Sequence, residues 1–207
     1  MNISELFTTD RTTRPTTKKG WKITLNSPVI LIFAALCLVA TILNYATGGF
    51  SNQLLFMTYH SSLTDPLTYV RFFTHAIGHV GWEHLMGNMA YVLLLGPLLE
   101  EKYGSKTILG VMAITAFACA LVNYLLFPNT ALCGASGIVF AFILLSSVTG
   151  MREGEIPLTF ILVAVIFLGQ QIFTGIFVAD NVSNLSHIIG GVVGGIAGFA
   201  LCKPRSK

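Results

Sequence analysis

Residues 133–140 read CGASGIVF and place one hydroxyl, that of Ser136, among small side chains at the start of an apolar run. One interpretation is packing, since Gly, Ala and Ser at helical spacing let two membrane helices approach closely. The other makes Ser136 a nucleophile, because the flanking glycines admit a substrate backbone and a helix starting here directs free N–H groups at an oxyanion. The nucleophile elbow of soluble hydrolases does not fit, since Ile138 stands where its second glycine would be.

The composition of the 207-residue chain excludes a soluble domain. Hydrophobic residues make up 54% and charged residues 10% of the sequence, and the mean hydropathy is +0.74. Apolar runs of about 18 residues or more recur, as is typical of membrane-spanning helices. The length suits one domain, and the cysteines lack paired spacing, so they are interpreted as small apolar residues. The sequence therefore predicts an all-α polytopic membrane protein.

Capping and breaking signals divide the chain into six predicted spans. Ser27-Pro28 is typical of a helix start, with Ser as N-cap and Pro as the first helical residue. A long, partly membrane-embedded loop at about 49–81 separates the first span from the second. The predicted spans cover about 28–46, 82–100, 106–126, 134 or 135 to 150, 157–178 and 183–202. The expected organisation is a basic tail at 1–26, a six-helix membrane domain at 27–202 and a basic tail at 203–207.

The distribution of Lys and Arg sets the expected orientation. Six spans put both termini on one side, and placing the termini in the cytoplasm leaves every Lys and Arg except Arg71 inside. This topology also accounts for the net charge of +3, so we infer no nucleic-acid partner. We expect an integral multi-pass protein of a bacterial plasma membrane with both termini inside, since the sequence shows no organelle-targeting segment.

Helices two, four and six of this topology begin at the outer face, where polar residues gather. His84 and Asn88 lie in the first turns of helix two, Ser136 begins helix four, and His187 lies near the start of helix six. Unpaired polar groups are costly in hydrocarbon, so these residues are functional candidates, with independent packing residues as the alternative. We expect His187 to act as the base for Ser136. His84, Asn88 and the backbone N–H of Ser136 are expected to donate to an oxyanion.

A glycine repeat adds a steric argument. Glycines recur every four residues at Gly190, Gly194 and Gly198. They share one helical face with His187 and let another backbone approach, the natural partner being the small-residue start of helix four. This packing would bring His187 within hydrogen-bond reach of Ser136. No Asp or Glu lies near enough in sequence on either helix to orient the imidazole, so the prediction is a dyad.

A metal site is the competing interpretation of the histidines. His75, His79 and His84 offer three imidazoles to zinc. The spacing between His75 and His79 lacks the internal glutamate of the metalloprotease signature. We therefore expect no metal, and interpret His75 and His79 as structural residues of the loop.

These motifs resemble those of the rhomboid intramembrane serine proteases over about residues 69–200. The matching motifs are His75-Ala76-Ile77-Gly78-His79, His84-x-x-x-Asn88, Gly96-x-x-x-Glu100-x-x-x-Gly104, Gly134-Ala135-Ser136-Gly137 and His187-x-x-Gly190-x-x-x-Gly194. The resemblance implies a six-helix rhomboid-like bundle with Ser136 as nucleophile and His187 as general base. It also implies that His84, Asn88 and the backbone N–H of Ser136 donate hydrogen bonds to the oxyanion. Supporting roles are expected for Gly134, Gly137, Phe140, Gly190, Gly194, Glu100, His75 and His79.

The chain departs from the family pattern at two places. Some members have Tyr four residues after the serine, stacked on the base, where this chain has Phe140; the stacking should survive without the hydroxyl. The long loop of some members carries a Trp-Arg pair, where this chain has Val70-Arg71, which leaves the anchoring of the loop open. Inactive relatives lack the serine or the histidine, and this chain has both.

The sequence therefore predicts an intramembrane serine endopeptidase that cleaves single-span membrane proteins near the outer membrane face. Its partners would be transmembrane protein substrates and the lipid bilayer, without a metal or organic cofactor. The alternative is a non-proteolytic rhomboid-like protein that binds transmembrane segments, and labelling by a serine-directed probe separates the two. A channel or transporter is disfavoured, because the sequence shows neither an inverted repeat nor a ring of charges.

Overall fold

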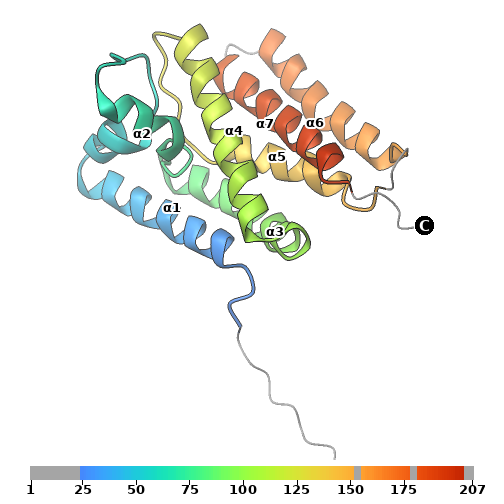
Figure 1. The fold of residues 1–207 in the computed structure, drawn as a ribbon. Helices are drawn as coiled ribbons and strands as arrows, with labels where there is room; N and C mark the ends of the chain where they lie inside the picture. Colours follow the sequence, from blue (N-terminus) through green and yellow to red (C-terminus); the bar gives the residue numbers. More distant parts are fainter. Residues whose placement is uncertain (1–23, 152–154, 178–180, 203–207) are drawn as a thin grey trace, which may run out of the picture.

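Helices account for about three quarters of the computed structural model, which describes residues 24–151, 155–177 and 181–202. This part of the chain forms seven α-helices and one π-helical turn (Figure 1). The elements are α1 (Pro28–Ala46), η2 (Asn52–Phe56), α2 (Pro66–Thr74), α3 (Trp82–Tyr103), α4 (Ser105–Leu126), α5 (Ser136–Ser147), α6 (Leu158–Phe177) and α7 (Asn181–Ala200). The tail predicted at 203–207 and most of the tail predicted at 1–26 lie outside the described residues.

The predicted spans correspond to α1 and to α3–α7 within a few residues. The fourth begins at Ser136 rather than at 134 or 135, and it ends at Ser147 rather than at 150. The loop predicted at 49–81 is only partly a loop, because it contains η2 and α2. Neither element has the long apolar run by which the spans are recognised. Helix α2 starts instead on a local signal, a hydrogen bond of 3.0 Å from Leu67 N to the Asp65 side chain.

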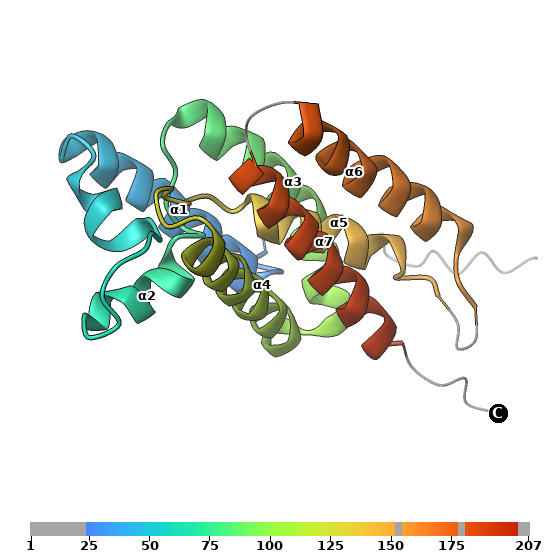
Figure 2. The ribbon, with the colours of Figure 1, turned by 90° about the horizontal axis from the view of Figure 1, so that it is seen from above.

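Helix α5 lies at the centre of the bundle. Figures 1 and 2 show α3, α4, α6 and α7 around it, and each of them contacts it. Apart from Phe140, all residues from Gly137 to Leu145 are buried. Helix α1 packs against α3 and α4 at one edge of the bundle, and α2 packs against η2 and α4. The serine singled out by the sequence is therefore the first residue of the central helix.

Two rows of glycines let α7 approach α5 and α6 closely. A Cβ atom at Gly190 would collide with the carbonyl oxygen of Gly137 on α5, and one at Gly194 would collide with that of Ala141. On the second row, a Cβ at Gly191 would collide with a side chain of α6. Two backbones reach such contact only where one helix lacks side chains. The prediction that the glycine face packs on the helix of Ser136 is confirmed.

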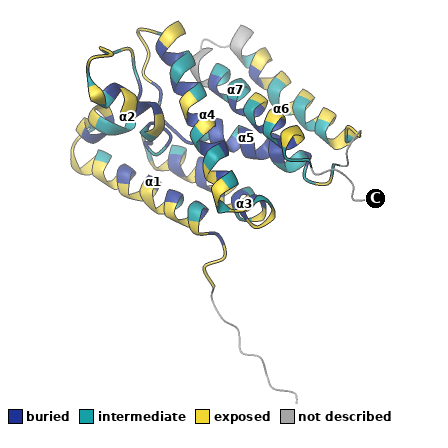
Figure 3. Ribbon diagram, in the orientation of Figure 1, coloured by how far each residue is buried: buried dark blue, intermediate teal, exposed yellow. Residues whose placement is uncertain are grey.

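Side chains are distributed as in a protein whose solvent is apolar. Large apolar residues are exposed on the outer faces of α1, α3, α4, α6 and α7 (Figure 3), and patches of this extent are typical of a membrane surface. Helices α1 and α4 are long and apolar enough to span a bilayer, and shorter apolar segments lie at Ser136–Ser147, Leu158–Thr174 and Asn184–Ala200. The number of spans and the side of the termini stay predictions.

A carboxylate from α3 holds the start of α1. Ser27 occupies the N-cap position, but its hydroxyl makes no capping hydrogen bond. Buried Glu100 supplies the cap instead, since its carboxylate accepts from Val29 N at 3.1 Å and from Ile30 N at 3.0 Å. Ser105 Oγ donates to the same carboxylate at 2.7 Å. The negative charge faces the positive end of the α1 dipole, so Glu100 joins α1, α3 and α4.

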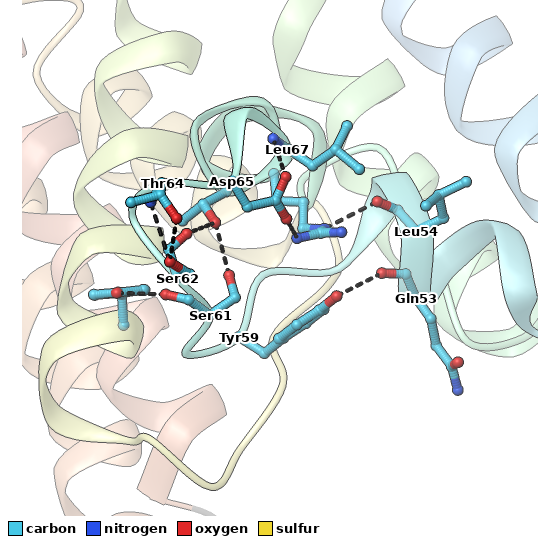
Figure 4. A network of polar contacts seen from close by, with 11 residues as sticks. Gln53, Leu54, Tyr59, Ser61, Ser62, Thr64, Asp65 and Leu67 are labelled. Atoms are coloured by element: carbon cyan, nitrogen blue, oxygen red, sulfur yellow. Dashed lines mark hydrogen bonds and ion pairs between the residues drawn. The ribbon is translucent and has the colours of Figure 1, made fainter.

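A buried arginine organises the segment between α1 and α3. Arg71 on α2 is 4% exposed. It donates through Nε to the Leu54 carbonyl at 2.9 Å and through Nη1 to Asp65 at 3.3 Å (Figure 4). Its guanidinium carbon also lies 4.8 Å from the centre of the Tyr59 ring, a cation–π contact. Arg71 therefore supplies an anchor for the loop without the Trp-Arg pair.

We expect Glu100→Gln to destabilise the bundle more than the matched change Glu101→Gln at the exposed neighbouring position. Glutamine leaves one acceptor oxygen for three donors and removes the negative charge at the start of α1. A charge-assisted hydrogen bond contributes about 1.5–3 kcal/mol to the free energy of unfolding. Thermal unfolding of the purified proteins in detergent measures the difference. Equal unfolding midpoints for the two variants would contradict the capping role.

Candidate active site

Ser136 stands at the N-terminus of α5, where a glycine turns the chain. Gly134 has a φ of +124°, a left-handed conformation that strains residues with a side chain. Its N–H donates to the His75 carbonyl at 2.9 Å. No side chain caps α5 in the described structure, so the N–H groups of its first turn and the positive end of its dipole are available to an anion. An oxyanion formed beside Ser136 would meet these donors.

The long loop also positions the residues that precede the serine. Thr58 and Leu132 form an antiparallel bridge, with N–H···O distances of 2.9 and 2.8 Å. On α4, the buried Asn123 amide donates to the Thr130 carbonyl at 3.2 Å. The bridge between Thr58 and Leu132 joins segments that are far apart in sequence, so the loop acts as a scaffold for the turn into α5.

Two side chains of α3 lie against the turn at Gly134. A Cβ at Gly134 would collide with His84, at 2.7 Å from its Nε2, and would lie at an ordinary contact distance of 3.6 Å from Asn88 Nδ2. Glycine at this position therefore leaves room for His84. Asn88 is 7% exposed, and its Nδ2 is buried without a hydrogen-bond partner in the described structure. The structure thus brings both predicted oxyanion donors to the N-terminus of α5.

His187 on α7 lies flat against the ring of Phe140. The ring centroids are 4.4 Å apart and the planes differ by 5°, so the predicted stacking is present. Phe140 follows Ser136 by four residues, and both therefore lie on one face of α5. Ser186, the neighbour of His187, lines a cavity of about 10 Å³ together with Ser136. The predicted base is thus brought to the face of α5 that carries the predicted nucleophile.

The sequence analysis missed a polar partner of the imidazole. Gln171 on α6 is 9% exposed, and its Oε1 lies 2.7 Å from His187 Nδ1. An orienting acid would be expected only on the two helices of the dyad, whereas this amide comes from a third helix. A signal was present, since Gln170-Gln171 interrupts the apolar run of α6, and polar residues within a membrane helix are functional candidates.

The loop histidines make structural contacts. His75 Nε2 donates to the Ala116 carbonyl at 3.0 Å, and burial lowers the pKa of His75 to about 4. His79 Nδ1 bonds the Ile77 carbonyl at 3.0 Å, and burial together with nearby His84 lowers the pKa of His79 to about 4. The His79 ring meets that of His84 edge-on at 5.0 Å. In the described part of the chain no three His, Cys, Asp or Glu side chains converge on a metal position.

Comparison with known proteins gives a family match over the region that holds all these residues. The model of the rhomboid domain matches residues 66–204. Rhomboid-related protein 1 of Caenorhabditis elegans is 31% identical over 140 residues, which are 63% of this chain and 39% of that protein. Rhomboid protease GlpG of Haemophilus influenzae is 23% identical over 184 residues, 86% of this chain and 93% of that protein.

Rhomboid-related protein 2 of Mus musculus is 27% identical over 198 residues, which are 86% of this chain and 65% of that protein. The chain thus spans from well under half to nearly all of the length of these relatives. The rhomboid domain match runs from α2 past the end of α7 and takes in well over half of the chain. The apolar-faced helical bundle is therefore that of an integral membrane protein, and the chain belongs to the rhomboid family.

Proposed function

We propose that the protein is an intramembrane serine endopeptidase that cleaves transmembrane segments of single-span membrane proteins. The observation that carries the proposal is the buried Asn88 amide, whose Nδ2 has no partner in the described structure and lies beside the turn into α5. An unpaired donor in a low-dielectric interior costs free energy, and a developing oxyanion would offset that cost. The names of two relatives, both called rhomboid protease GlpG, support the same reaction class.

In the proposed mechanism, His187 Nε2 takes the proton of Ser136 Oγ as this oxygen attacks the scissile carbonyl. The carbonyl π electrons move to its oxygen, and that oxyanion accepts hydrogen bonds from His84, Asn88 and the N–H of Ser136. When the oxyanion collapses, the C–N bond breaks and the imidazolium gives its proton to the leaving amine. Water then attacks the acyl-enzyme with His187 as base, which releases the acid and regenerates Ser136.

The depth of the site sets the expected substrate. In the proposed topology of six spans with both termini inside, the start of α5 faces the outer side of a bacterial plasma membrane. A transmembrane helix hides its carbonyl groups in internal hydrogen bonds, and exposing them in hydrocarbon costs several kcal/mol each. Substrates should therefore unwind easily near the outer face, as segments with Gly or Pro do. The remaining alternative, a protein that binds transmembrane segments without cutting them, is decided by the first experiment below.

Ser136→Ala and His187→Ala are each expected to abolish cleavage of a single-span reporter without unfolding the bundle. The two losses should not add, because each removes one half of a single nucleophilic unit. Labelling with a fluorophosphonate probe should follow the same pattern. A folded wild-type protein that binds the reporter but neither cuts it nor takes up the probe would favour the non-proteolytic alternative.

Asn88→Ala should lower kcat about 100- to 1000-fold while KM changes little, because the amide donates to charge that develops only in the transition state. Asn44→Ala on α1, a helix that makes no contact with α5 in the described structure, is the matched control and should leave kcat unchanged. Steady-state kinetics on a reporter in detergent or liposomes separates kcat from KM. An equal effect of both variants on kcat would remove Asn88 from the oxyanion hole.

Gly194→Leu should inactivate the enzyme although the residue lies about two turns from His187. The added carbons would push α7 away from the Ala141 carbonyl, and a displacement of about 1 Å at the reacting groups can cost about 100-fold in rate. Gly169→Leu is the control, since a Cβ at this exposed glycine of α6 meets nothing within 4 Å. Normal probe labelling of the Gly194 variant would show that this contact does not position the base.

A further inference from the structure

A short polar contact crosses the interface between α6 and α7. The distance from Gln171 Oε1 to His187 Nδ1 is 2.7 Å, and Gln171 is 9% exposed within a helix that carries no charged residue. A buried amide in an apolar helix is costly unless it is paired. The contact joins residues sixteen positions apart in the chain, so the packing of two helices creates it.

This contact defines the hydrogen positions on the imidazole. An amide oxygen can only accept a hydrogen bond, so Nδ1 must carry the proton that it donates to Gln171. In a neutral ring the other nitrogen, Nε2, then holds the lone pair. A base for Ser136 needs that lone pair, because the opposite tautomer offers Nε2–H and cannot accept the serine proton.

We propose that Gln171 is a positioning residue that holds His187 in the Nδ1–H tautomer and fixes the rotation of its ring. This inference rests on the proposed function. Phe140 already fixes the plane of the ring by stacking at 5°, but a 180° flip about χ2 keeps that plane and exchanges the positions of Nδ1 and Cδ2. A hydrogen bond at one corner prevents this flip. Gln171 thus takes the place that a carboxylate has in a Ser-His-Asp triad, without bringing a charge into the apolar interior.

Gln171 is not the sole contact that packs α6 on α7. One turn further along α6, Thr174 Oγ1 bonds Asn184 Oδ1 on α7 at 3.0 Å. Gly191 of α7 lies directly against the Leu168 side chain of α6. These contacts keep the two helices in register, so a change at Gln171 tests the imidazole rather than the fold.

The titratable groups that other helices bring to this region do not replace the amide. His84 on α3 lies against Gly134, and Cys119 on α4 donates its thiol to the Ser186 carbonyl at 3.4 Å. From α5 the imidazole meets the uncharged ring of Phe140. None of these three groups brings a carboxylate to His187, so none of them takes the role of the amide.

The first test compares the rates of Gln171 variants. Gln171→Met keeps the volume of the side chain but removes the acceptor, and it should lower kcat about 10- to 100-fold with KM changed less than about threefold. Gln171→Glu restores an acceptor and should recover most of the activity at alkaline pH. Its pH–activity profile should move to higher pH on the acid side, because a carboxylate stabilises the imidazolium.

Two controls isolate the role of the amide. Gln170→Met changes the neighbouring exposed glutamine, and Thr174→Val removes a second polar contact between α6 and α7. Both should cleave the reporter at the wild-type rate with an unchanged pH profile. Loss of activity in Thr174→Val equal to that in Gln171→Met would mean that any polar link between these helices suffices, which overturns the inference.

The second test reads the tautomer directly, without activity. In protein labelled with ¹⁵N-histidine, the NMR signal of His187 is identified by its loss in His187→Ala. Its ¹⁵N chemical shifts should report the Nδ1–H tautomer in the wild type. In Gln171→Met the chemical shifts should show a smaller population of that tautomer. Unchanged shifts in this variant would refute the inference even if wild-type cleavage is normal. If the wild type neither cuts nor labels, the proposed function fails, and the spectrum still decides whether Gln171 sets the tautomer.

Discussion

The close approach of α5 and α7 is the contact on which the rest of the structure depends. Gly190 sets the backbone of α7 against the Gly137 carbonyl, at a separation that a side chain would prevent. The same interface stacks Phe140 on His187, so the spacing of two backbones also places the imidazole. Fold and candidate chemistry therefore share one contact, and a substitution within it changes both.

Polar interactions take on in this bundle the role that apolar burial has in a soluble protein. Lipid is as apolar as the exposed faces of the helices, so burial of apolar surface contributes little to helix association, whereas close packing and internal hydrogen bonds contribute more. Glu100 caps a helix other than its own, Arg71 ties α2 to the residues after α1, and Gln171 joins α6 to α7. Each of these side chains is buried and links its own helix to another element of the fold.

The segment between α1 and α3 shows how a loop becomes part of a site. Its mixed polar and apolar residues predict no regular span, yet the structure forms η2 and α2 within it. The bridge from Thr58 to Leu132 and the bond from Gly134 N to the His75 carbonyl then hold the turn that leads into α5. The position of Ser136 thus depends on residues more than fifty positions earlier in the chain.

The sequence by itself determined the helical segments, because in lipid a long apolar run must satisfy its backbone groups within one helix. It also singled out Ser136 and His187, since polar residues stand out in apolar helices and glycines at fixed spacing mark a face for close contact. Only the tertiary structure decided that Glu100 rather than Ser27 caps α1 and that Gln171 meets His187. Such pairs depend on how each helix is rotated against its neighbours, and a local pattern contains no information about the residue that a neighbouring helix presents.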